Sequence, residues 1–86
     1  MKLEIELEDY RKEMGIKLKW ESGYSIKVEK TDNEVLILAN KAGLISLANH
    51  LLTLSQDGIT KGAHIHLDEY NSLEEDSVDI IIEKAL

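Results

Sequence analysis

Two histidines and an aspartate occupy every second position of one short segment. The segment runs His64-Ile-His-Leu-Asp68, and alternation places His64, His66 and Asp68 on one face of a strand. Two imidazoles and a carboxylate form the ligand set of many transition-metal sites. The spacing weakens this interpretation, because alternate residues lie about 6.5–7 Å apart and the three would span about 13 Å. A carboxylate from an adjacent strand would have to complete the site.

Several acidic residues are candidates for that completing ligand, among them Asp79, Glu83, Glu4, Glu6 and Glu8. The alternative is a solvated sheet face, on which the histidines form hydrogen bonds with neighbouring acids. We favour the solvated face, because no spacing here matches a two-Cys-two-His or HExxH motif. A small metal-binding domain or metalloenzyme that uses the strand face of His64 and His66 stays open as a second hypothesis.

Other catalytic signatures are missing from the sequence. There is no cysteine, which excludes disulfides, thiolate metal sites and cysteine nucleophiles. No serine lies in a nucleophile-elbow sequence, and the segment from Gly58 to Gly62 lacks the spacing of a phosphate-binding loop. His50 stands alone among leucines, and we expect it at the border of the core. The sequence therefore predicts a protein that is not an enzyme and that needs no cofactor.

The densest charge lies between residues 68 and 76, where five of nine residues are acidic. Such a surface can steer and dock a basic protein, although a solvated charged loop is the plainer alternative. Tyr70 lies among these acids, and an aromatic residue rimmed by charge is typical of interface hot spots. The candidate partner-binding residues are Asp68, Glu69, Tyr70, Glu74, Glu75 and Asp76.

The overall charge excludes several classes of function. Ten basic against seventeen acidic residues give 10 − 17 = −7, which argues against binding of nucleic acid or of an anionic membrane. No apolar run approaches the about 20 residues that a membrane span needs. The charged start Met1-Lys2-Leu3-Glu4 is unlike a signal peptide. We therefore expect a cytoplasmic protein, and its 86 residues predict a single domain, 1–86.

Hydropathy patterns predict an α+β fold. Strands that alternate apolar and polar residues are expected at 2–8, 16–20, 24–29, 63–68 and 78–83. The short link between 16–20 and 24–29 predicts a hairpin. Residues 35–39 are apolar on both faces, which fits either a buried central strand or the lead-in to a helix. The expected product is a four- to five-stranded, mainly antiparallel sheet.

One helix is expected, at about 40–56, to cover one face of that sheet. Asn40 is a suitable N-cap, and Gly43 in the first turn suggests that a neighbouring strand packs close. Residues recur with helical spacing and should face the sheet: Leu44, Leu47, Ala48, Leu51, Leu52 and Ser55, with Ile45 and Leu54 widening the stripe. The predicted order of elements is β-β-β-(β)-α-β-β.

The C-terminal half of the chain resembles a known family. The segments Asn40-Lys-Ala-Gly-Leu44, Leu47-Ala-Asn-His-Leu-Leu52, His64-Ile-His-Leu-Asp68, Ser72-Leu-Glu-Glu-Asp-Ser-Val78 and Ile80-Ile-Ile-Glu83 are similar to immunity protein family 32, small bacterial proteins of polymorphic toxin systems. The resemblance implies stoichiometric binding of a cognate toxin, whose active or substrate site is occluded. Many such toxins are nucleases with basic clefts. The resemblance assigns no binding residues.

Self-association is a third hypothesis. If the first or the last strand were an exposed edge, two copies could pair there. The glutamates of those strands argue against this pairing, because like charges would face one another. We expect a monomer or a weak homodimer.

Overall fold

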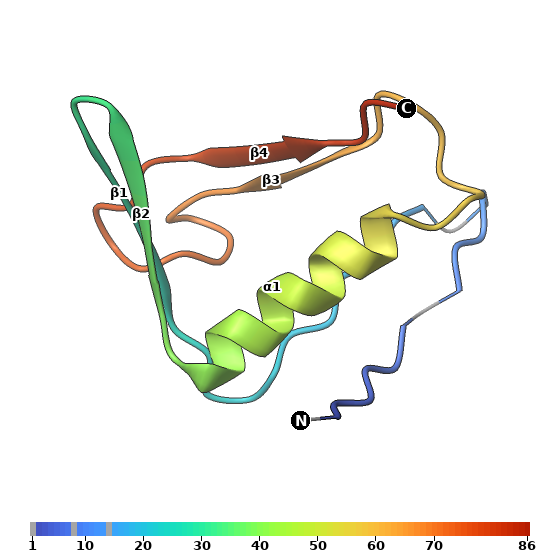
Figure 1. Cartoon of the computed structure of the whole chain (residues 1–86), viewed down its shortest axis with the longest axis horizontal. Coiled ribbons are helices and arrows are strands. Elements are labelled where there is room, and N and C mark those ends of the chain that lie inside the picture. The colour runs from blue at the N-terminus through green and yellow to red at the C-terminus, as the bar shows by residue number, and fades with distance from the viewer. Residues whose placement is uncertain (1, 8, 14) are drawn as a thin grey trace.

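The computed structural model describes residues 2–7, 9–13 and 15–86. Its elements follow the order β1 (Ile26–Thr31), β2 (Glu34–Ala39), α1 (Lys41–Leu54), β3 (His64–Leu67) and β4 (Ile80–Glu83). The α+β class is confirmed, but the strands form two separate two-stranded sheets, β1–β2 and β3–β4 (Figure 1). The prediction of one sheet with four or five strands is therefore wrong.

The first sheet is a hairpin in which β1 and β2 run antiparallel to each other and are joined by Asp32 and Asn33. Its register runs from Thr31 opposite Glu34 to Ile26 opposite Ala39. The hairpin predicted between 16–20 and 24–29 is wrong, because β1 pairs forward along the chain across a two-residue turn, a common hairpin connection. Residues 35–39 do form a strand, yet it is largely exposed and not central.

Neither of the two predicted N-terminal strands forms in the residues that the structure describes. The described part of 2–8, which leaves out Glu8, is not a strand, and neither is 16–20. Side chains of α1 bind the backbone of both regions: Asn49 Nδ2 donates to Glu6 O at 3.0 Å, and His50 Nε2 donates to Lys19 O at 2.9 Å. Ser46 Oγ also accepts from Glu21 N at 2.8 Å, just past the second region. In these two segments, backbone groups bond to side chains of α1 instead of to a neighbouring strand. The alternation of apolar and polar residues here therefore accompanies an extended segment that lies along a helix.

The start of α1 is tied to the hairpin. Asn40 is the N-cap as predicted, and its Oδ1 accepts from Gly43 N at 2.8 Å and from Ser25 N at 3.0 Å. A Cβ atom on Gly43 would lie 2.5 Å from Ser25 O and 2.9 Å from Ile26 Cγ1. The predicted close approach of a strand is therefore confirmed, and only glycine fits this contact.

The buried face of α1 is rotated from the predicted leucine stripe toward the polar side of the helix, although Leu47 still packs against the core and Leu54 is buried in it. The buried residues of α1 are mostly polar or small: Gly43, Ser46, Asn49, His50, Thr53 and Leu54. Leu44, Leu51 and Leu52 are 45–56% exposed. The rotation arises because the extended N-terminal segments need hydrogen-bond partners and the polar face of α1 supplies them. His50, expected at the border, is 0% exposed.

The core joins the hairpin, the end of α1 and the second sheet. Its buried apolar residues are Ile26, Val28, Leu54, Ile59, Ile65, Leu67 and Leu73. Trp20 packs against this core, stacks on Tyr24 at a centroid distance of 4.5 Å and meets the His50 ring edge-on at 4.3 Å. In the described part of the chain, no helix has the length and apolar character to span a bilayer.

Candidate functional site

The acidic residues lie in the connection between β3 and β4, residues 68–79, called here the β3–β4 loop (Figure 1). This loop is bound to the outer edge of β1. Glu74 N donates to Ile26 O at 2.8 Å, Val78 N donates to Val28 O at 2.9 Å, and Ser77 Oγ accepts from Val28 N at 3.1 Å. The loop backbone is thus fixed to the core over much of its length.

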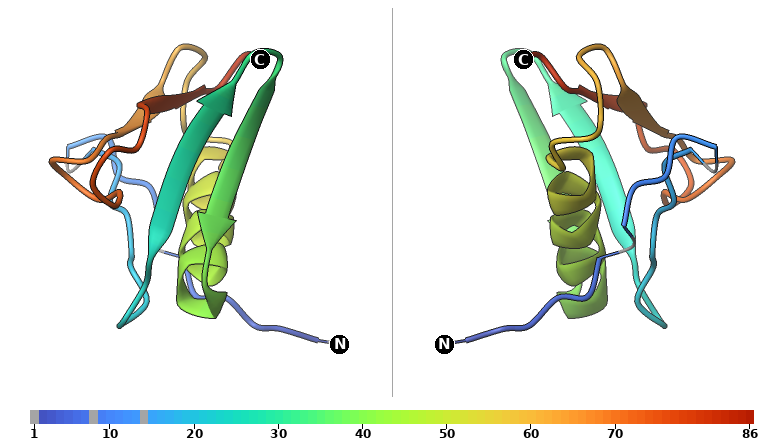
Figure 2. Two further views of the ribbon diagram at one scale, coloured as in Figure 1. Left: turned by 90° about the vertical axis from the view of Figure 1, so that its left-hand side faces the viewer. Right: turned by 90° about the vertical axis from the view of Figure 1, so that its right-hand side faces the viewer.

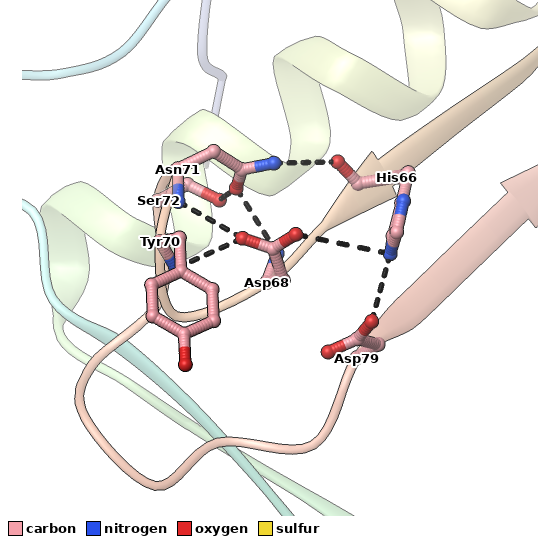
Figure 3. Close-up of polar contacts among 6 residues, drawn as sticks. All are labelled: His66, Asp68, Tyr70, Asn71, Ser72 and Asp79. Atoms are coloured by element: carbon pink, nitrogen blue, oxygen red, sulfur yellow. Dashed lines mark hydrogen bonds and ion pairs between the residues drawn. The ribbon is translucent and has the colours of Figure 1, made fainter.

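The first turn of the loop is organised by Asp68 (Figure 3). Its Oδ1 accepts from Tyr70 N at 2.9 Å and from Asn71 N at 3.0 Å, which is an Asx-turn. Asn71 in turn donates from Nδ2 to His66 O and accepts from Asp68 N, both at 3.0 Å. With its side chain only 22% exposed, Asp68 has a structural role in addition to its charge.

A second internal bond closes the loop. Glu69 Oε2 accepts from Asp76 N at 2.8 Å, and Asp76 has a positive φ of 67°. Aspartate tolerates this left-handed conformation better than most residues. Two of the predicted binding residues, Asp68 and Glu69, therefore also shape the loop that carries the others.

The remaining predicted binding residues face solvent. Tyr70 is 91% exposed, which rules out a core role, and Glu74, Glu75 and Asp76 are also exposed. The negative charge of Glu69, a hydrogen bond with its carboxylate and the charges of Asp68 and Asp79 raise the pKa of Tyr70 above its usual value. The raised pKa means that the phenol stays protonated, and its hydroxyl donates to the Glu69 carboxylate.

The structure gathers one histidine and two acids at the base of this loop. His66 Nε2 lies 2.9 Å from Asp79 Oδ2 and 4.0 Å from Asp68 Oδ2, and the three candidate ligand atoms lie within 4.8 Å of one another. His64 is not part of this group among the described residues; its Nδ1 lies 3.5 Å from Gly62 O. The predicted pair of metal ligands, His64 and His66, is therefore not brought together.

Asp79 is the residue that the predicted binding set left out. His66 lies opposite Ile81 across the second sheet, and Asp79 precedes Ile81 by two positions. Diagonal neighbours on one face of an antiparallel pair lie within reach of long side chains. The alternation of both segments carried this signal, since it had already suggested Asp79 as the completing carboxylate.

The comparison with known families identifies the chain. A family model described as immunity protein 32 matches residues 34–85. The chain belongs to the immunity protein 32 family. The matched region contains β2, α1, β3, β4 and the whole β3–β4 loop. Searches of curated proteins and of solved structures gave no match.

Membership of the immunity protein 32 family sets the class of function. It implies a toxin as the binding partner and favours a binding protein over an enzyme. The family match confirms the resemblance that the sequence motifs suggested. It also places the acidic loop of this immunity protein inside the matched region, whereas residues 2–33 lie before it.

Proposed function

We propose that this immunity protein neutralises its cognate toxin in the cytoplasm of the producing cell by covering the toxin's active or substrate site with the β3–β4 loop. One observation carries the proposal: a run of exposed carboxylates is displayed on a loop whose backbone is bound to the core. The loop binds as a stoichiometric inhibitor, and no catalytic step is needed.

The charge of the loop suits a basic partner. Residues 68–79 include six acids and no lysine or arginine: Asp68, Glu69, Glu74, Glu75, Asp76 and Asp79. A toxin that cleaves nucleic acid must hold phosphates with basic side chains, and carboxylates can occupy the same positions. The proposed toxin therefore has a basic cleft, as a nuclease has.

The fixed backbone favours tight binding. Ordering a loop on association lowers affinity, because each immobilised side chain and backbone segment loses entropy. Here the bonds to Ile26 and Val28 and the turns at Asp68 and Glu69 order the loop before any partner arrives. Tyr70 adds an exposed aromatic ring at the centre of the acids, where it can fill a pocket of the toxin.

The test begins with capture of the partner from the native host on the tagged protein and its identification by mass spectrometry. The affinity of the purified partner is then measured for the wild type and for the triple variant Glu74→Lys, Glu75→Lys and Asp76→Asn. Asparagine is chosen at position 76 because it tolerates the positive φ there. We expect Kd to rise about 100-fold or more, and inhibition of the toxin by the wild type to compete with its substrate.

A matched control separates the loop from the overall charge. Glu4→Lys, Glu13→Lys and Asp57→Asn change exposed acids outside the loop and alter the net charge by the same amount, from −7 to −7 + 2 + 2 + 1 = −2. The control should bind within a few-fold of the wild type. Equal loss in both variants would mean non-specific attraction, and wild-type affinity of the loop variant would remove the loop from the interface.

A metal site is the second candidate function, favoured by the close approach of His66, Asp68 and Asp79. We place it second because Asp68 Oδ1 already holds the turn and His66 Nε2 already meets Asp79. A ligand that binds the native state raises its stability. A rise in Tm with added Zn²⁺ that His66→Gln abolishes would establish metal binding, and an unchanged Tm would exclude it.

A further inference from the structure

The two edges of the β1–β2 hairpin differ in their hydrogen bonding. Asn40 N donates to Ser25 O at 3.1 Å, so the even-numbered residues of β2 bond to β1 and Val35, Ile37 and Ala39 point their backbone groups the other way. On the far side of β1 the β3–β4 loop fills the equivalent positions. In the described part of the chain, the outer edge of β2 meets no strand, and both views of Figure 2 show it open.

That open edge lies beside exposed apolar side chains. We define the β2–α1 surface as Val35, Leu36, Ile37 and Leu38 of β2 with Leu44 and Leu51 of α1, which are 41–60% exposed. Leu44 and Leu51 lie seven residues apart and so share one side of the helix. The register of the hairpin places Val35 and Ile37 on the face that carries Ile26 and Val28, against which α1 begins, and Leu36 and Leu38 on the other face, so apolar side chains flank the open edge on both faces.

We propose that this surface binds a second copy of the same chain, through antiparallel pairing of the two β2 edges. A two-fold axis perpendicular to the sheet keeps each residue on its own face, and the register centred on Ile37 then uses the free backbone groups. In that register Ile37 faces Ile37 of the second copy, Val35 faces Ala39, and Leu36 faces Leu38. In this register the outward-pointing N–H and C=O groups of one copy form hydrogen bonds with the C=O and N–H groups of the other copy.

Charge complementarity selects this partner and this register. The only charge in β2 is Glu34, at one end, and Lys41 begins α1 just past the other end. Both are exposed. The register places Glu34 opposite Asn40 of the second copy and next to the second copy's Lys41, and symmetry repeats the contact. An edge with so few charges also lacks the usual protection against strand pairing.

The same chemistry argues against the toxin as the occupant. The proposed toxin is basic and is attracted to carboxylates, whereas the β2–α1 surface offers apolar side chains and a free backbone edge. A second copy supplies the same uncharged edge and the same leucines. The inference does not depend on toxin binding, because it requires only the purified full chain.

The test measures oligomeric state by sedimentation equilibrium and light scattering over a wide range of protein concentration. The wild type should show a monomer–dimer equilibrium. Ile37→Lys places two lysines on the two-fold axis and should raise the dimer Kd at least about 100-fold. Ile81→Lys is the matched control, because Ile81 is also an exposed isoleucine, on β4, at 61%. Its Kd should stay within a few-fold of the wild type.

A charge exchange tests the register independently of the fold. Glu34→Lys and Lys41→Glu should each weaken the dimer, and the double exchange should restore it. A monomer at all concentrations would overturn the inference, as would a dimer that Ile37→Lys leaves intact. Loss of toxin affinity in Ile37→Lys without any wild-type dimer would show that the toxin occupies the surface instead.

Discussion

The β3–β4 loop and the β2–α1 surface are both exposed, but they differ in how well water solvates their side chains and in whether their backbone hydrogen bonds are complete. The loop displays carboxylates, which are well solvated, and its backbone bonds are completed within the protein. The β2–α1 surface displays branched apolar side chains and a strand edge that lacks a partner among the described residues. The first region is stable alone and suits a partner of opposite charge. For the second region, burial of its apolar surface against a partner would lower the free energy.

The two edges of the β1–β2 hairpin differ in the same way, because one has its backbone groups bonded and the other, in the part of the chain that the structure describes, does not. Backbone groups of Ile26 and Val28 on β1 are bound by the loop, which is why the loop is fixed. The corresponding groups of β2 project away from β1. One hairpin thus holds the proposed toxin-binding loop on one edge and leaves the other edge for the proposed dimer contact, so the two partners need not compete.

The largest expected effect compares a leucine from each region. Leu73 belongs to the β3–β4 loop and is 5% exposed, whereas Leu44 on the β2–α1 surface is 56% exposed. Leu73→Ala should lower the free energy of unfolding by about 2–5 kcal/mol, through lost burial and the cavity left behind. Leu44→Ala should change it by less than about 0.5 kcal/mol in the monomer. Urea unfolding measures both, and equal effects would refute the contrast in burial.

A smaller effect is expected where the loop meets β1. Ser77 Oγ accepts from Val28 N in a buried position, and Ser77→Ala would leave that N–H without a partner. The free energy of unfolding should fall by about 1–3 kcal/mol. The exposed Ser22 provides the control, since Ser22→Ala should have little effect. If thermal melts of the two variants coincide, the bond to Ser77 does not hold the loop.

The smallest expected effect concerns the buried side of α1. His50 Nε2 donates to Lys19 O at 2.9 Å, while Nδ1 is buried without a partner. Burial lowers the pKa of His50 from its usual 6.5, outweighing the backbone bond to Lys19, which raises it. The unfolded chain therefore takes up this proton first as pH falls. The stabilising contribution is complete above pH 6.5 and is lost progressively below it.

The measurement is Tm as a function of pH for the wild type and for His50→Gln, which keeps a donor for Lys19 O but does not titrate. The variant should lose part of the decline in Tm between neutral and mildly acidic pH. His64→Gln, at an exposed position, should keep the wild-type profile. Identical profiles for wild type and His50→Gln would show that His50 does not contribute.

The accuracy of the sequence predictions depended on how local each feature was. The cap at Asn40, the glycine at position 43 and the last two strands follow from neighbouring residues, and the structure confirms them, with the last strand starting at Ile80 instead of Val78. The exposure of Tyr70 was also predicted from its acidic surroundings. The metal hypothesis paired His66 with His64 and offered Asp79 only as one of several completing acids, because which acid lies beside His66 depends on strand register.

The sequence by itself determined the α+β class, the acidic loop and membership of the immunity protein 32 family, because composition, alternation and motif spacing are properties of the chain alone. Only the tertiary structure decided which face of α1 is buried. A leucine stripe marks a core face only if another element comes to cover it, and here the N-terminal segments lie extended against the polar side. Their unpaired backbone groups require hydrogen bonds, and that requirement outweighed the burial of the leucines.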